Sequence, residues 1–150
     1  MFQIITEKFY EDLTVQSNLY ANQEQARKNA TSHFIPFTVS DLMAFVGIVI
    51  AMGVVCLPTL HDYWSTDPIL SHPWFGAVMS RRRFGEILSY LHVVDNSSEP
   101  DRSAPDYDKL WKIRPLITML SENCLKYYST HPQVSVDESM IGTKCRLSFI

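Results

Sequence analysis

Apolar residues recur at helical spacing along several long stretches of the chain. In residues 2–28, the positions Phe2, Ile5, Phe9 and Leu13 fall near one face, with charged residues mostly opposite. This pattern predicts an amphipathic helix over residues 2–28.

A second apolar stripe follows Ser80, which is placed to cap a helix. The stripe consists of Phe84, Ile87, Leu88 and Leu91. Arg82 and Glu86 form an i,i+4 pair on the opposite face, as on a solvated helix surface. These features predict a helix that begins just after Ser80.

A third stripe lies beyond the polar, proline-containing loop at residues 95–106. Its apolar positions are Leu110, Ile113, Ile117, Leu120 and Cys124. Pro115 lies inside this stripe and predicts a kink or a restart of the helix. His131 and Pro132 then end the helical pattern.

The segment from 42 to 57 has no periodicity because it is apolar throughout and carries no charge. It is shorter than the roughly 20 residues of a membrane-spanning helix and ends at Pro58. We therefore expect a fully buried core helix, apolar on all sides, and not a membrane span. Thr38 with Asp41 three residues later resembles a capping box at its start.

Strand signals appear only at 133–137 and 143–149, joined by a turn around Gly142. A lone two-stranded hairpin is marginally stable in water. The expected fold is mainly α, with a helical region at 1–131 and the first strands of an incomplete sheet at 132–150. We expect the sequence to be a piece of a longer protein.

Charge and cysteine content narrow the possible classes of protein. The formal net charge is −3 at pH 7, so any contact with nucleic acid must depend on a local patch. Cys56, Cys124 and Cys145 lie far apart without a CxxC pair, which indicates neither a disulfide framework nor a zinc site. A reducing compartment fits this pattern.

One carboxylate is a candidate metal ligand. Asp137 stands at the end of the first predicted strand, with Glu138 beside it. Magnesium favours such oxygen ligands, but two-metal phosphoryl chemistry requires several carboxylates from different elements. The alternative is that both residues simply end a strand and begin a turn.

Two groups of cations are candidate phosphate contacts. Lys144 and Arg146 lie two apart on a strand and share one face. Arg81, Arg82 and Arg83 stand at a helix start, where the helix dipole favours acids instead. Solvated surface positions are the alternative for both groups.

Five motifs, in order, resemble piggyBac-type transposases. They are FTVSDLMAFVGIVIAMGV (37–54), HDYWSTDPIL (61–70), FGAVMSRRRFGEILSYLHVVDN (75–96), KLWKIRPLI (109–117) and VSVDESMIGTKCRLSF (134–149). The last is similar to the start of the family's catalytic domain, although Cys145 stands where the family usually has glycine. The resemblance covers nearly the whole chain.

The resemblance implies a helical dimerisation and DNA-binding domain that leads into the first β-hairpin of a ribonuclease-H-like core. It places Asp137 on the first of three catalytic aspartates, which together hold two magnesium ions. Lys144 and Arg146 match basic positions near DNA. The implied partners are transposon and target DNA and a second copy of the chain, with nuclear localisation and no membrane or small-molecule substrate.

The other two aspartates of that metal site are absent from these 150 residues. We therefore expect this chain alone to be catalytically inactive, and at most to bind DNA or dimerise. The alternative is a domesticated helical protein-interaction module without DNA chemistry, which the net negative charge favours.

Overall fold

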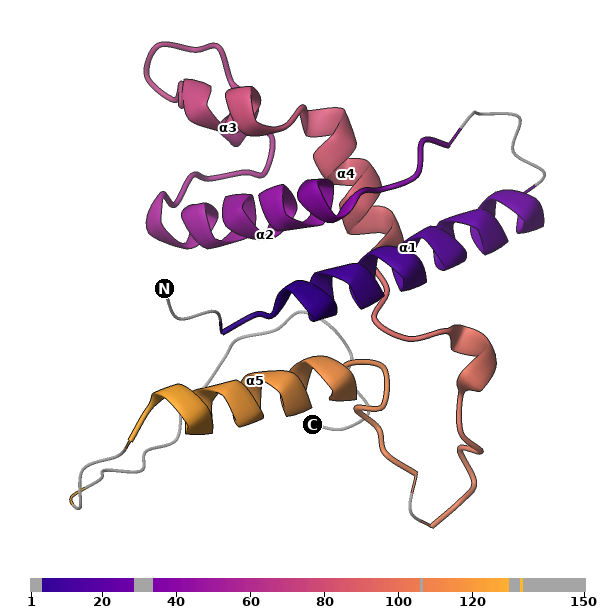
Figure 1. The fold of residues 1–150 in the computed structure, drawn as a ribbon. Coiled ribbons are helices and arrows are strands. Elements are labelled where there is room, and N and C mark those ends of the chain that lie inside the picture. The colour runs from indigo at the N-terminus through magenta and orange to yellow at the C-terminus, as the bar shows by residue number, and fades with distance from the viewer. Residues whose placement is uncertain (1–3, 29–33, 106, 130–132, 134–150) are drawn as a thin grey trace. The chain divides into compact units, whose positions relative to one another are not determined.

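The structure is a computed structural model that describes residues 4–28, 34–105, 107–129 and 133. All regular elements among these residues are helical (Figure 1). The mainly α class is therefore confirmed. The predicted strands lie, apart from Gln133, outside the described residues.

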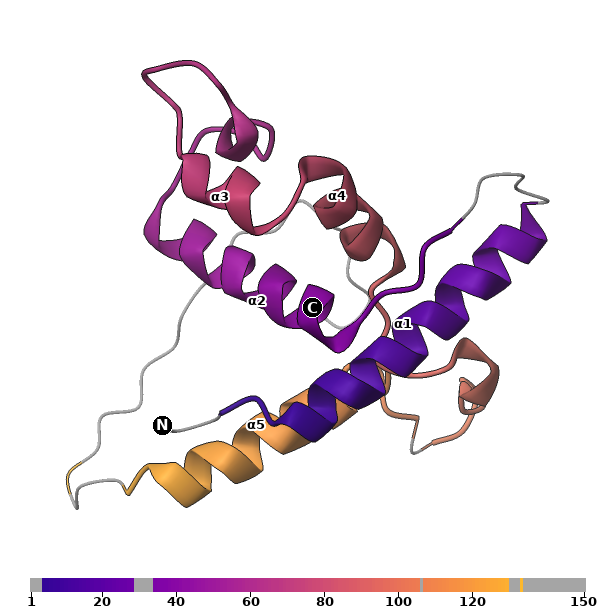
Figure 2. The ribbon, with the colours of Figure 1, turned by 45° about the horizontal axis from the view of Figure 1, so that its top comes forward.

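The chain divides into two compact units, Thr6–Glu99 and a second unit formed by Met1–Ile5 with Pro100–Ile150. The helices of the first unit are α1 (Glu7–Arg27), α2 (Val39–Val54), η1 (Asp62–Trp64), α3 (Pro73–Val78), α4 (Arg81–Tyr90) and η2 (Asn96–Ser98). Helix α1 packs against α2 and α4, and α2 also contacts α3 and α4 (Figures 1 and 2).

The core of this unit lies where α1, α2 and α4 meet and extends under α3. Aromatic side chains fill much of it, and the ring centroids of Phe45 and Phe84 are 4.8 Å apart. The buried apolar residues are Tyr10, Leu13, Ala21, Phe37, Leu42, Phe45, Ile48, Tyr63, Phe75, Met79, Phe84 and Ile87.

Polar side chains of α1 fix the segments that pass beside it. The buried Ser17 hydroxyl accepts from the backbone N–H of His92 at 3.1 Å and contacts the His92 carbonyl oxygen at 3.3 Å. The Asn18 side-chain oxygen accepts from the Phe37 backbone N–H at 2.7 Å, and the Asn18 side-chain nitrogen donates to the Phe37 carbonyl oxygen at 2.9 Å.

Helix α1 begins at Glu7 and not at residue 2, because Thr6 caps it.

Helix α2 begins at the predicted capping box. The Thr38 hydroxyl accepts from the Asp41 backbone N–H at 3.1 Å, and the Asp41 carboxylate accepts from the Thr38 N–H at 2.9 Å.

The expectation that α2 is a fully buried helix is wrong. Only Leu42, Phe45 and Ile48 are buried, because packing partners cover one side of α2 alone.

Helix α4 has the predicted Ser80 cap, whose hydroxyl accepts from the Arg83 backbone N–H at 3.2 Å. Phe84 and Ile87 are buried, but Leu88 is 52% exposed. The apolar stripe is therefore wider than the surface that α4 buries.

The smaller unit contains α5 (Arg114–Tyr127), with Pro115 in its first turn. The helix therefore starts one residue before this proline, as the restart alternative predicted. Asn123 donates to the backbone oxygen of Ile4 at 2.8 Å, which ties Ile4 to this helix. In the part of the chain that the structure describes, no helix is both long and apolar enough to cross a membrane.

Candidate nucleic-acid interface

The three consecutive arginines form the first turn of α4, directly after the Ser80 cap. The backbone N–H groups of Arg81 and Arg82 precede the first intrahelical hydrogen bonds and contribute to the positive end of the helix dipole. The first turn contains no acidic residue. Positive charge therefore accumulates at this end of the helix.

Arg83 points back into its own unit. Its guanidinium donates to the backbone oxygens of Ile35 at 2.8 Å and Pro36 at 2.9 Å. It also pairs with the Asp41 carboxylate at 2.9 Å and lies 4.7 Å from the centroid of the Phe37 ring. This set of contacts joins the start of α4 to the segment that leads into α2.

Asp41 contacts two helices: it caps the start of α2 and forms an ion pair with Arg83 of α4. Partial burial acts to raise its pKa, but hydrogen bonds from Thr38 and Arg83 outweigh burial and lower the pKa below 3.8. The carboxylate therefore stays ionised at neutral pH, and the Arg83 charge is matched within the fold.

Arg81 and Arg82 differ from Arg83 because both are exposed. The Arg82 side chain is 83% exposed, and its Nε lies 3.5 Å from the Glu86 carboxylate, a separation typical of a weak surface pair. Among the described residues, Arg81 has no ion-pair partner. Both guanidinium groups are thus accessible to an external anion.

The two exposed arginines border a surface hollow of about 480 Å³. The residues lining it are Leu60, His61, Arg81, Arg82, Phe84 and Gly85. Its lining therefore combines two cations and an imidazole with apolar side chains. The two guanidinium groups in this lining are chemically suited to phosphate oxygens.

The sequence did not indicate His61 or Leu60 as members of this site. They precede η1, about 20 residues before the arginines. No spacing rule links the two segments, since folding alone brings them together.

Asp137, Lys144 and Arg146 lie outside the described residues, so their roles stay predictions. No group of three or more His, Cys, Asp or Glu side chains suited to a metal occurs within the described ranges.

Comparison with known proteins identifies the family. The family model described as Transposase IS4 matches residues 2–150. Human PiggyBac transposable element-derived protein 3 is 32% identical over 142 residues, which cover 91% of this chain and 22% of that protein. Human PiggyBac transposable element-derived protein 2 is 31% identical over 139 residues, covering 89% of this chain and 22% of that protein.

The chain thus spans about a fifth of the length of these curated relatives. No solved structure gives a significant match. The match to the family model extends over nearly the whole sequence, including the predicted strands beyond α5. The chain belongs to the Transposase IS4 family, as a piggyBac-type member.

Proposed function

We propose that this chain is the helical DNA-engaging part of a piggyBac-type transposase, and that Arg81 and Arg82 contact the phosphate backbone of DNA. The observation that carries the proposal is that the three arginines differ in their contacts and in their exposure to solvent. Arg83 is held inside the fold, whereas Arg81 and Arg82 border the hollow with accessible guanidinium groups.

Physical chemistry favours phosphate as the ligand of these two side chains. A guanidinium presents several donors in a planar fork that matches phosphate oxygens, and the positive end of α4 adds to the attraction. A local cationic patch is sufficient for such contacts, even in a chain of net charge −3.

The C-terminal residues extend this proposal to the complete protein. Residues 132–150 would form the first hairpin of a ribonuclease-H-like core, with Asp137 as one ligand of the catalytic magnesium ions. Lys144 and Arg146 would contact DNA beside it. A nuclear location and a homodimer complete the proposal, which rests on membership of the transposase family.

Catalysis by these 150 residues alone is not part of the proposal. A two-metal site needs several carboxylates, and these residues supply only the first of the three aspartates that the family resemblance implies. We expect no magnesium-dependent cleavage of DNA by the purified chain.

A second candidate function is a helical protein-interaction module that has lost DNA chemistry. The exposed apolar side of α2 favours it, as does the net negative charge. The two human relatives are named as proteins derived from transposable elements. DNA binding by the exposed arginines separates the two candidates.

The test compares the affinity for a DNA duplex of the wild-type chain and the Arg81→Ala, Arg82→Ala double variant, by fluorescence anisotropy. The matched control is Lys8→Ala with Lys28→Ala, which removes the same charge from exposed positions on or beside α1. We expect the arginine variant to bind roughly tenfold more weakly than the control. Equal affinities of the two variants would favour the interaction module.

A further inference from the structure

Gly85 lies in the middle of α4 and lines the hollow that Arg81 and Arg82 border. Glycine is less favourable than alanine inside a helix, because its backbone loses more freedom on folding. A Cβ atom built at Gly85 would meet no atom within 4 Å outside the adjoining backbone of α4. No neighbour in the described fold therefore requires a glycine at this position.

Helix geometry fixes the position of Gly85 relative to the two exposed arginines. Residues three and four apart lie on the same face of a helix, so Gly85 shares a face with Arg82 and Arg81. A helical side chain points back toward the N-terminus and covers the surface of the preceding turn. A larger side chain at position 85 would therefore lie over the surface beside the two arginines, which the glycine leaves open.

Two residues of another segment complete the hollow. Leu60 and His61 precede η1 and line the same space of about 480 Å³. Leu60 is 47% exposed and offers apolar surface. The imidazole of His61 supplies at least one N–H donor in either protonation state. The hollow thus brings cations, a further donor and apolar surface to the bare backbone at Gly85.

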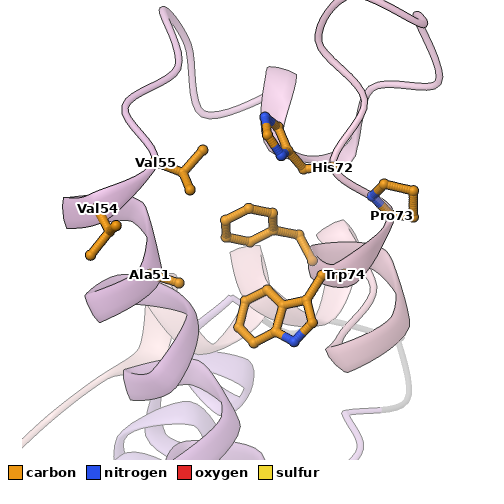
Figure 3. Close-up of a pocket in the computed structure, with 7 residues that line it drawn as sticks. Ala51, Val54, Val55, His72, Pro73 and Trp74 are labelled. Atoms are coloured by element: carbon orange, nitrogen blue, oxygen red, sulfur yellow. The ribbon is translucent and has the colours of Figure 1, made fainter.

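A second hollow, of about 440 Å³, has a different lining (Figure 3). It lies between the end of α2 and the start of α3, with Val54 on one side and Trp74 on the other (Figure 3). Neither lysine nor arginine is among the described residues that line it. Gly47 of α2 lines neither hollow, and a Cβ atom there would also meet nothing within 4 Å. Gly47 is therefore a matched reference for Gly85.

We propose that one strand of DNA crosses α4 at Gly85, with its phosphates on Arg81 and Arg82 and a sugar against the helix backbone. The missing Cβ atom is what lets the strand approach so closely, and the His61 imidazole donates to the same stretch of strand. This inference rests on the proposed function. It deepens that function by assigning a residue that controls how closely DNA approaches the helix.

The lining favours a strand of DNA over a single small anion. Two guanidinium groups match two successive phosphates, and Leu60 with the open backbone at Gly85 offers contact to the sugar between them. A free phosphate ion would need only the cations and would gain nothing from a glycine. The cost of Gly85 to the helix is thus offset by contact with the strand.

The test combines thermal unfolding with duplex binding, measured by fluorescence anisotropy on the full 150-residue chain. Gly85→Ala and Gly85→Leu should each raise the unfolding midpoint of the larger unit by about 4 °C, because both residues favour helix over glycine. The same variants should bind DNA more weakly, by about threefold for alanine and at least tenfold for leucine. Gly47→Ala and Gly47→Leu should raise the midpoint similarly and leave DNA affinity unchanged.

Two results would overturn the proposal. Wild-type DNA affinity in Gly85→Leu would show that the strand does not approach α4 at this residue, and would leave the arginine contacts standing. Loss of stability in both Gly85 variants, without such a loss in the Gly47 variants, would show that the fold itself requires the glycine.

A double-mutant cycle links Gly85 to the arginines. If leucine keeps DNA out of the hollow, Arg81→Ala with Arg82→Ala should weaken binding less than about threefold in the Gly85→Leu background, against roughly tenfold in the wild-type background. Additive effects would overturn the proposal, since the residues would then act on separate contacts. An arginine variant that binds DNA normally in the wild-type background would instead remove the proposed function itself, so the two failures are distinguishable.

Discussion

At the scale of single residues, the three arginines of α4 differ in what each contacts. Arg83 satisfies two backbone oxygens and a carboxylate within its unit, and its side chain is 18% exposed. Arg82 is 83% exposed and has one weak partner, Glu86. Neighbouring residues of identical type therefore have separate roles, one in stability and the other at the surface.

These contacts predict unequal effects on stability. Arg83→Ala leaves Asp41 partly buried without its cation and removes the donors to Ile35 and Pro36, so unfolding in urea should be easier by about 2 kcal/mol. Arg82→Ala should stay within about 0.5 kcal/mol of the wild type. Equal losses for the two variants would show that Arg83 does not hold the fold in this way.

A second residue-scale prediction concerns pH. The hydrogen bond from Arg114 lowers the pKa of Asp108 from 3.8 to about 2, and the Leu110 backbone N–H adds to this. Because the folded pKa lies below the ordinary one, the stabilising contribution is present above about pH 4 and is lost as pH falls toward 2.

Carboxyl NMR titration measures this pKa directly. The Asp108 signal should titrate near pH 2 in the wild type and at a clearly higher pH in Arg114→Ala, still below its ordinary value because the Leu110 N–H remains. Asp101 is the internal control, because its pKa is lowered by Ser103 and does not depend on Arg114. The same Asp108 titration in both proteins would refute the ion pair.

At the scale of elements, the caps determine where the helices begin. Thr38→Ala removes the acceptor of the Asp41 N–H and should destabilise the larger unit by about 1 kcal/mol in thermal unfolding. Thr38→Ser keeps the hydroxyl and should restore most of that loss. If serine were no better than alanine, the loss would come from the missing methyl group and not from the cap.

The starts of α2 and α4, and that of α5 as one of two alternatives, were predictable from the sequence because their causes are local. Ser80, Thr38 with Asp41, and Pro115 act on residues three or four positions away, and the structure has each of them at a helix start. The exposed side of α2 was not predictable. A helix that is apolar all round has no polar face in its sequence to indicate which side meets solvent.

At the scale of the whole molecule, the family followed from motifs spread along the chain, and the mainly α class followed from the spacing of apolar residues. Both are confirmed. The inward direction of Arg83 and the position of His61 beside the exposed arginines did not follow from sequence. Both depend on contacts between segments 20 to 48 residues apart, which local patterns do not specify. The roles of Asp137, Lys144 and Arg146 stay predictions.

The salt dependence of DNA binding tests the central claim most directly. Each phosphate contact that a cation makes contributes about 0.9 to the slope of the logarithm of affinity against the logarithm of salt concentration. The Arg81→Ala, Arg82→Ala variant should therefore give a slope about 2 units shallower than the wild type, between about 50 and 200 mM salt. Parallel slopes would contradict the assignment of these two arginines to DNA phosphates.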